Sequence, residues 1–185
     1  MKNYLKGLLL MLQGRAEGTV FFPQNLTAAK HSFLLALWLM PLYIYMMYRL
    51  QIEDGAVIPE LVPFLIIQAS VYTLYWVLYP LVVYYLARYL DRPAAYPSYI
   101  IMYNWVKATQ IILLSLLWVL GETGWVNKSA FMVLNTALMV TLVVAEWNIV
   151  RFGLRLGGFM PLNFLFLEGI IGLLIAAVAE SLLPN

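Results

Sequence analysis

Long apolar stretches separated by short polar loops set the pattern of the whole chain. Because roughly 20 apolar residues are needed to cross the hydrocarbon of a bilayer, we predict five transmembrane helices. They cover residues 32–50, 61–90, 99–120, 129–150 and 163–183. The predicted fold class is therefore all-α: a polytopic membrane helical bundle of five transmembrane helices, preceded by a short interfacial amphipathic helix.

The second stretch is too long to cross a bilayer upright. At a rise of 1.5 Å per residue, residues 61–90 form a helix of about 45 Å. We expect this helix to tilt, to kink at Pro80 or to project beyond the membrane, and we expect Pro41 to bend the first helix.

The N-terminal segment, residues 1–31, differs in pattern from the single transmembrane domain predicted over residues 32–185. Leucines fall on one face of a short helix, which predicts an amphipathic helix lying in the headgroup region. A helix packed on the underside of the bundle fits the same pattern. Because the unbroken apolar run is too short for a signal peptide and no cleavage motif follows it, we expect this segment to be retained. The leucines on this face are Leu5, Leu8, Leu9 and Leu12.

The composition indicates that a bilayer is the solvent of this chain. Of its 185 residues, 64% are hydrophobic and 11% are charged, whereas roughly a quarter are charged in a soluble domain. The net charge of +2 is small and the basic residues are scattered, so we predict no nucleic-acid partner. The chain has no cysteine, one histidine and no local motif of nucleotide binding, metalloprotease or serine hydrolase chemistry. We therefore predict no enzymatic activity, no cofactor and no metal site.

The basic residues are divided unequally between the two sides of the predicted membrane. Eight lie on one side and two on the other, and Lys107 lies within a span. Because cytoplasmic loops carry the excess of Lys and Arg, we predict a cytoplasmic N-terminus and an outside C-terminus, in the cell (inner) membrane or in an endomembrane of a eukaryote. The eight are Lys2, Lys6, Arg15, Lys30, Arg88, Arg92, Arg151 and Arg155, and the two are Arg49 and Lys128.

A lysine and two glutamates lie inside separate apolar stretches, at Lys107, Glu146 and Glu168. Charges within a membrane are costly and normally face the interior of a bundle. Lys107 lies about 12 Å, and each glutamate about 7 Å, from the cytoplasmic end of its span. Since a lysine side chain extends several ångströms toward the interface, its ammonium can reach either carboxylate. Asn104, Asn148 and Asn163 belong to the same predicted polar layer, which His31 at the start of the first span can join.

Three interpretations of this polar cluster are open. The first is an interhelical ion pair that fixes the packing register. The second is functional: a proton or ion relay, or a polar docking site for a partner helix. In the third, Lys107 extends into the lipid headgroups without pairing.

Small residues on the fifth span, at Gly169, Gly172 and Ala176, predict a face that another helix can approach closely. Gly172 and Ala176 form a small-xxx-small pair. We expect an internal packing face, with a dimer contact as the alternative.

Tyrosines on the second span form a stripe at helical spacing, at Tyr72, Tyr75 and Tyr79. Such a stripe can bind a flat amphipathic ligand or a quinone. It can also serve helix packing, with the hydroxyls finding partners in the bundle. We expect the packing role.

Two sequence segments resemble a known family. AYPSYIIMYNW opens the third span and WNIVRFGLRL closes the fourth, within a five-span plan whose N-terminus lies inside. In these features, residues 33–183 resemble bacterial relatives of the Yip family, the Ypt/Rab-interacting membrane proteins. The resemblance implies a non-enzymatic five-helix membrane protein that works through partners, and it assigns no functional residue.

The function predicted from the sequence is that of a non-enzymatic accessory or scaffold protein. It acts in the lipid bilayer through a membrane-protein partner or through its own copies, using the polar cluster and the N-terminal helix. The alternative is a small transporter or channel component, with Lys107, Glu146 and Glu168 lining a path. No internal repeat of the kind common in secondary transporters is visible.

Overall fold

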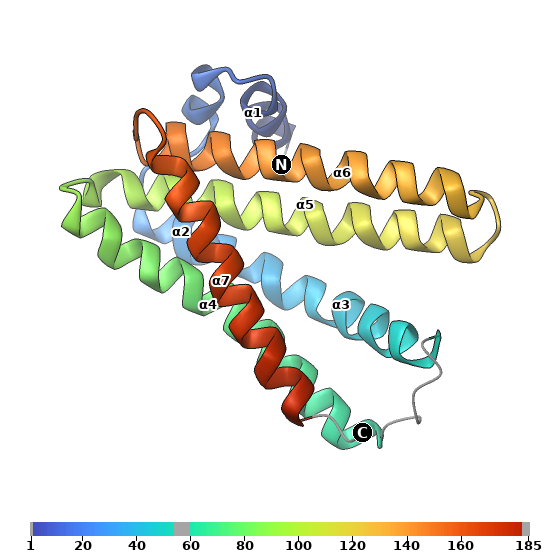
Figure 1. The fold of residues 1–185 in the computed structure, drawn as a ribbon. Helices are drawn as coiled ribbons and strands as arrows, with labels where there is room; N and C mark the ends of the chain where they lie inside the picture. The colour runs from blue at the N-terminus through green and yellow to red at the C-terminus, as the bar shows by residue number, and fades with distance from the viewer. Residues whose placement is uncertain (1, 54–59, 183–185) are drawn as a thin grey trace.

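The computed structural model describes residues 2–53 and 60–182, and every regular element in these ranges is helical (Figure 1). The predicted end of the fifth span at Leu183 and the outer ends of the two predicted segments, Met1 and Asn185, lie outside the described residues. The elements are α1 (Lys2–Leu12), η1 (Ala16–Phe21), α2 (Leu26–Ser32), α3 (Leu34–Glu53), α4 (Leu61–Tyr89), η2 (Pro93–Ala95), α5 (Tyr96–Glu122), α6 (Lys128–Asn148), the π-helical turn η3 (Ile149–Gly153) and α7 (Met160–Leu182).

Five helical stretches in the described residues are long and apolar enough to cross a membrane. The all-α prediction and the number of long apolar helices are thereby confirmed. The first stretch begins earlier than predicted, at Leu26, because the Asn25 side chain accepts a hydrogen bond from the Ala28 amide at 2.8 Å and caps α2. Both Pro41 and Pro80 lie inside continuous helices, α3 and α4.

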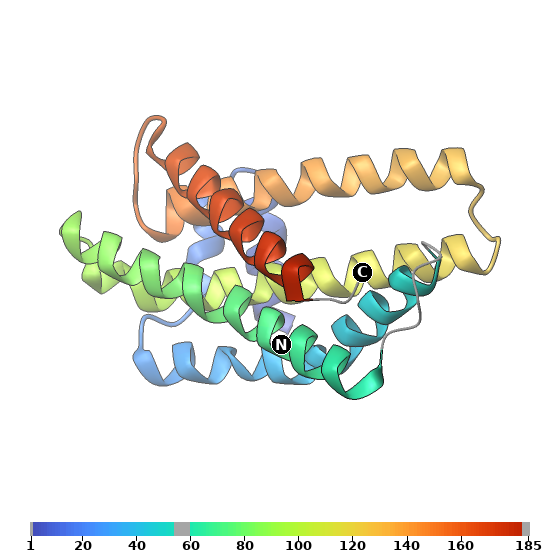
Figure 2. The same cartoon turned by 60° about the horizontal axis from the view of Figure 1, so that its bottom comes forward.

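The long helices form two pairs that diverge from each other (Figures 1 and 2). In one pair, α5 and α6 are antiparallel neighbours joined by a short loop, and in the other α7 packs along α4. Helix α3 packs against both α4 and α5, so it joins the two pairs on one side. The pairs meet at one end of the bundle, where α1 and α2 also lie.

The core is densest on α5, at the end where the helix pairs meet. Five consecutive residues from Tyr99 to Tyr103 are each no more than 3% exposed. A helix that is buried on all sides needs apolar residues all round, and this stretch of α5 is enclosed by α1, α2, α4, α6 and η3. Lys107 lies one turn further along the same helix, next to this core.

The N-terminal helix α1 packs against α5 and α6 rather than standing apart from the bundle. Leu8 and Met11 are buried at 7% and 1% exposure, whereas Leu5 and Leu9 are exposed. The predicted apolar face is therefore divided, with one part packed on the bundle and the other part open to the surroundings.

Candidate functional site

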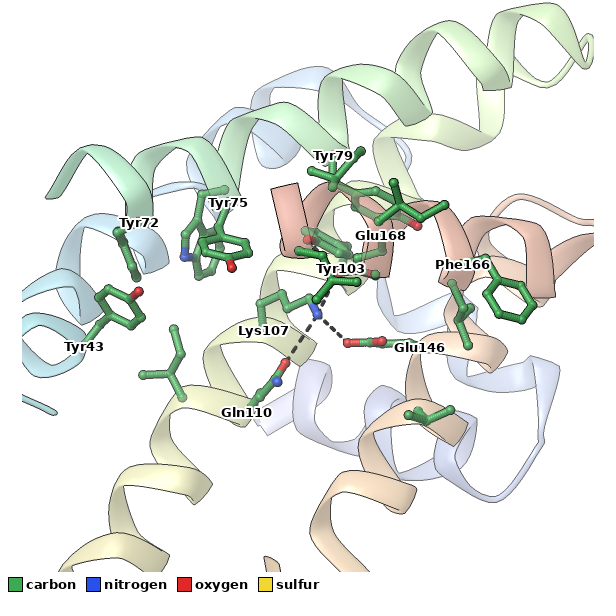
Figure 3. Close-up of a pocket in the computed structure, with 18 of the residues that line it drawn as sticks. Tyr43, Tyr72, Tyr75, Tyr79, Tyr103, Lys107, Gln110, Glu146, Phe166 and Glu168 are labelled. Carbon is green, nitrogen blue, oxygen red and sulfur yellow. Dashed lines mark hydrogen bonds and ion pairs between the residues drawn. The ribbon is translucent and has the colours of Figure 1, made fainter. Parts of the chain in front are cut away.

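Three long helices contribute one charged residue each to a single contact. The Lys107 ammonium on α5 forms ion pairs with Glu146 on α6 and with Glu168 on α7, the latter at 2.7 Å from Nζ to Oε1. The three side chains retain 20%, 14% and 18% exposure. Lys107 also donates a hydrogen bond at 3.4 Å to Oε1 of Gln110, a residue one turn further along α5 (Figure 3). The ammonium thus has a partner for each of its three protons.

Tyr103 supports this ion-pair cluster from the buried side. Its hydroxyl donates to Glu168 Oε1 at 3.1 Å, and the Lys107 ammonium lies 5.4 Å from the centre of its ring. Hydrogen bonds to ionised groups and cation–π contacts both stabilise a charge that has been withdrawn from water. Tyr103 therefore contacts both the Glu168 carboxylate and the Lys107 ammonium and helps to hold them in place.

The cluster lines a cavity of about 870 Å³ between the two helix pairs. Residues from α3, α4, α5, α6 and α7 all contribute to its wall. Figure 3 shows Lys107, Glu146 and Gln110 in one part of the cavity, with Tyr43 and Tyr72 in another. A volume of this size is in the range of small-molecule sites. The charged residues are therefore not sealed into a filled core.

Aromatic residues form much of the cavity wall. The predicted tyrosine stripe of α4 lines the cavity, and each of its hydroxyls has a hydrogen-bond partner. Tyr72 donates to the Ala36 carbonyl at 2.8 Å, and Tyr75 donates to the Gly172 carbonyl at 3.0 Å. The Tyr79 hydroxyl accepts a hydrogen bond from the Tyr99 hydroxyl. The stripe thus serves packing while presenting ring surface to the cavity. The aromatic lining residues on α3, α4 and α5 are Tyr43, Tyr72, Tyr75, Trp76, Tyr79 and Tyr103.

The cavity has an apolar side between α6 and α7. Val143 on α6 and Phe166, Ile170 and Leu173 on α7 line the cavity and are also 52–72% exposed on the molecular surface. These residues put apolar, surface-exposed side chains at the edge of the cavity. The cavity therefore joins a charged interior to an apolar exterior.

The structure does not bring Asn104 or Asn148 into the ion-pair cluster. Asn104 donates to the Ser32 hydroxyl at 2.7 Å, and Asn148 donates to the Met11 carbonyl at 2.8 Å. Both amides are buried and connect the N-terminal helices to α5 and α6. Among the buried side-chain polar atoms of the described residues, Asn104 Oδ1 lacks a hydrogen-bond partner. These asparagines share a layer along the bundle with the cluster, but they hold the N-terminal region in place.

The small residues of α7 have different surroundings. Gly169 lines the cavity, and a Cβ placed there would meet no other atom within 4 Å. A Cβ at Gly172 would contact the Tyr75 ring at 3.5 Å, so Gly172 lies at the packing face of α7 with α4. Ala176 is partly buried further along α7. Gly172 thus contacts a neighbouring helix of the same chain through Tyr75.

Sequence reasoning missed two polar members of the cavity, Gln110 and Tyr43. Gln110 follows Lys107 by three residues, and this spacing puts both on one helical face, so it could have been found. No sequence signal separates Tyr43 from the other tyrosines of its span. His31 and Asn163, which could have shared the polar layer, are both exposed.

Comparison with protein families, with curated proteins and with solved structures finds no match to this chain. The described residues hold no group of three or more His, Cys, Asp or Glu side chains that could bind a metal ion. The functional assignment therefore depends on the geometry and chemistry of the cavity.

Proposed function

We propose that this chain is a multi-pass membrane protein with a cytoplasmic N-terminus and an outside C-terminus. The five long apolar helices support membrane insertion, and the unequal distribution of basic residues supports the orientation. In this arrangement α1 lies at the cytoplasmic interface, with Leu5 and Leu9 directed toward lipid and Leu8 and Met11 packed on the bundle.

Within that membrane protein, we propose that the cavity binds a small membrane-soluble molecule as part of a transport or transfer function. The observation that carries this proposal is that the ion pairs of Lys107 line an open cavity. An ion pair that only fixes helix register needs no open space beside it, whereas a binding site does. The cavity therefore favours a transporter component over the scaffold role that was the first expectation from the sequence.

The position of the cavity within the bundle supports the same function. It extends from the cytoplasmic half of the proposed membrane, at Leu162 and Glu146, toward mid-membrane positions such as Ile111 and Leu173. Ligand sites of bundles are built from side chains on facing helices. An apolar molecule in the bilayer would reach this site between α6 and α7.

A photoreactive neutral probe tests this proposal. Tetradecanol carrying a diazirine is added to proteoliposomes, and cross-linked residues are mapped by peptide mass spectrometry. We expect saturable labelling at Gln110 and Ile111, which line the cavity and are partly buried. Saturation separates binding at a site from general partitioning into lipid.

A cavity-filling variant and a matched control sharpen the result. Gly169→Leu places a side chain in the open space of the cavity, whereas Ala177→Leu adds the same side chain at an exposed position of the same helix that does not line the cavity. Labelling at Gln110 should fall in the first variant and persist in the second. Labelling confined to exposed residues and equal in all three proteins would contradict the proposed function.

A further inference from the structure

The cavity holds more acidic than basic side chains. One ammonium, that of Lys107, faces two carboxylates, those of Glu146 and Glu168. No other charged residue among the described residues lines the cavity. With all three groups ionised, the cluster holds one more negative charge than positive charge. Such an imbalance in a low-dielectric interior is costly unless a further cation or a proton joins it.

The polar atoms left free in this cluster are acceptors. The three protons of the Lys107 ammonium are directed to Glu146, Glu168 and Gln110. Both ion pairs use the Oε1 atoms of the glutamates, and no hydrogen bond within the described residues engages Oε2 of either carboxylate. An anionic ligand would add negative charge and find the ammonium already engaged. A cationic donor would find two free carboxylate oxygens.

The aromatic wall of the cavity also favours a positively charged ligand. Faces of tyrosine and tryptophan rings attract ammonium groups, with the strongest effect where water is excluded. Tyr103 already makes this contact with Lys107, at 5.4 Å from its ring centre. Tyr72, Trp76 and Tyr79 add aromatic surface to the wall of the same cavity. Quaternary ammonium ions are recognised by walls of this kind.

The apolar side of the cavity favours a cation that carries a hydrocarbon chain. Val143, Phe166, Ile170 and Leu173 make this side apolar and exposed. A hydrocarbon chain can leave the cavity between α6 and α7 with its apolar surface kept out of water. The ligand that satisfies both ends is amphipathic, with a charged head and an apolar tail.

We propose that the cavity binds an organic ammonium ion with an apolar tail, its head against the free carboxylate oxygens of Glu146 and Glu168 and its tail between α6 and α7. This inference rests on the proposed function and names the class of ligand. The ammonium compensates the surplus negative charge, and Tyr103 and Tyr79 present ring surface beside Glu168. The ammonium can belong to a single-chain amine, or to the headgroup of a bilayer lipid, where a phosphate anion accompanies it.

Competition against the neutral photoreactive tetradecanol tests the charge preference. Tetradecylammonium, tetradecanol and tetradecanoate have the same chain length and differ in head charge. We expect tetradecylammonium to block labelling at Gln110 at about tenfold lower concentration than tetradecanol, which corresponds to roughly 1.4 kcal/mol, and tetradecanoate to be the weakest. Equal potency of the ammonium and the alcohol would overturn this inference and leave the proposed function standing.

A carboxylate variant ties the preference to the cluster. Glu146→Gln leaves one carboxylate opposite Lys107, so the surplus negative charge is removed. This variant should lose the tenfold preference for tetradecylammonium over tetradecanol, while the neutral probe should still label Gln110. That persistence also shows that the variant is folded. The control, Glu122→Gln, changes a glutamate that pairs with Arg49 outside the cavity and should keep the preference. An unchanged preference in Glu146→Gln would contradict the inference, and absence of any labelling at Gln110 in the wild type would contradict the proposed function itself.

The lipid composition of the vesicles distinguishes a headgroup ammonium from the ammonium of a single-chain amine. Phosphatidylglycerol vesicles provide no amine, and addition of phosphatidylethanolamine provides a headgroup amine. Protection of Gln110 by phosphatidylethanolamine would support a bilayer lipid as the occupant. Protection by tetradecylammonium alone would support a single-chain amine.

Discussion

Lys107 on α5 and Glu168 on α7 form an ion pair at 2.7 Å, although α5 packs along α6 and α7 packs along α4. The pair therefore connects the two diverging helix pairs across the cavity. Glu146 brings α6 to the same ammonium. The cluster thus serves two purposes: it holds the helix pairs together, and it provides the polar end of the proposed ligand site.

Removing one member of this cluster should destabilise the bundle more than removing an oppositely charged pair. Lys107→Met leaves two carboxylates without a cation, which should cost about 3–5 kcal/mol. Adding Glu168→Gln to Lys107→Met should recover part of that loss. The measurement is a double-mutant cycle by denaturation in mixed micelles. If the losses of the single variants simply add, Lys107 and Glu168 are not coupled.

A surface pair provides the control for that cycle. Arg49 and Glu122 approach to 3.0 Å, but their side chains are 36% and 39% exposed. Exposed ion pairs contribute little because solvent screens them. The coupling energy of Arg49→Met with Glu122→Gln should be smaller than that of the Lys107 pair.

Asn148→Ala should loosen the N-terminal region. Its amide donates to the Met11 carbonyl, so the variant loses one buried hydrogen bond, worth about 1 kcal/mol. Such a loss should raise the population in which α1 is released from the bundle about fivefold, and the rate of trypsin cleavage after Arg15 should rise with it. Asn163→Ala, at an exposed position of α7, should leave the cleavage rate unchanged. Equal rates in both variants would show that the Asn148 contact does not hold α1.

Gly18→Ala should separate η1 from α1. A Cβ at this position would lie 2.6 Å from Met11 Cγ and would also meet the Gly7 carbonyl, so the two segments must move apart at a cost of about 1–3 kcal/mol. Because the chain has no cysteine, a single cysteine at Leu8, which is 7% exposed, reports this movement by faster maleimide labelling. Gly157→Ala, whose added methyl meets no other atom within 4 Å, is the matched control. Unchanged labelling in Gly18→Ala would contradict the close approach.

A reporter at the C-terminus tests the proposed orientation. The distribution of eight basic residues on one side against two on the other predicts an outside C-terminus. A C-terminal alkaline phosphatase fusion should therefore be active, while a C-terminal fluorescent protein that matures only in the cytoplasm should be dark. The opposite pattern would reverse the orientation and place the polar cluster in the outer half of the membrane.

The features of the site that could be predicted from the sequence depend only on the spacing of residues along single helices. A rise of 1.5 Å per residue is enough to put Lys107, Glu146 and Glu168 in one layer, and the spacing of Tyr72, Tyr75 and Tyr79 is enough to put them on one face. The partners of Asn104 and Asn148 were not predictable in this way. Their contacts depend on where α1 and α2 fold back against the bundle.

The sequence by itself determined that the described chain is helical and that five of its helical stretches are apolar enough to cross a membrane, because helix length and hydropathy are local properties. Only the tertiary structure decided that the helices diverge in pairs and leave a cavity beside Lys107. Apolar spans present similar faces in all directions, so their sequences do not specify which faces meet. The packing of side chains such as Tyr75 against Gly172 makes that choice, and with it the surroundings of the buried charges.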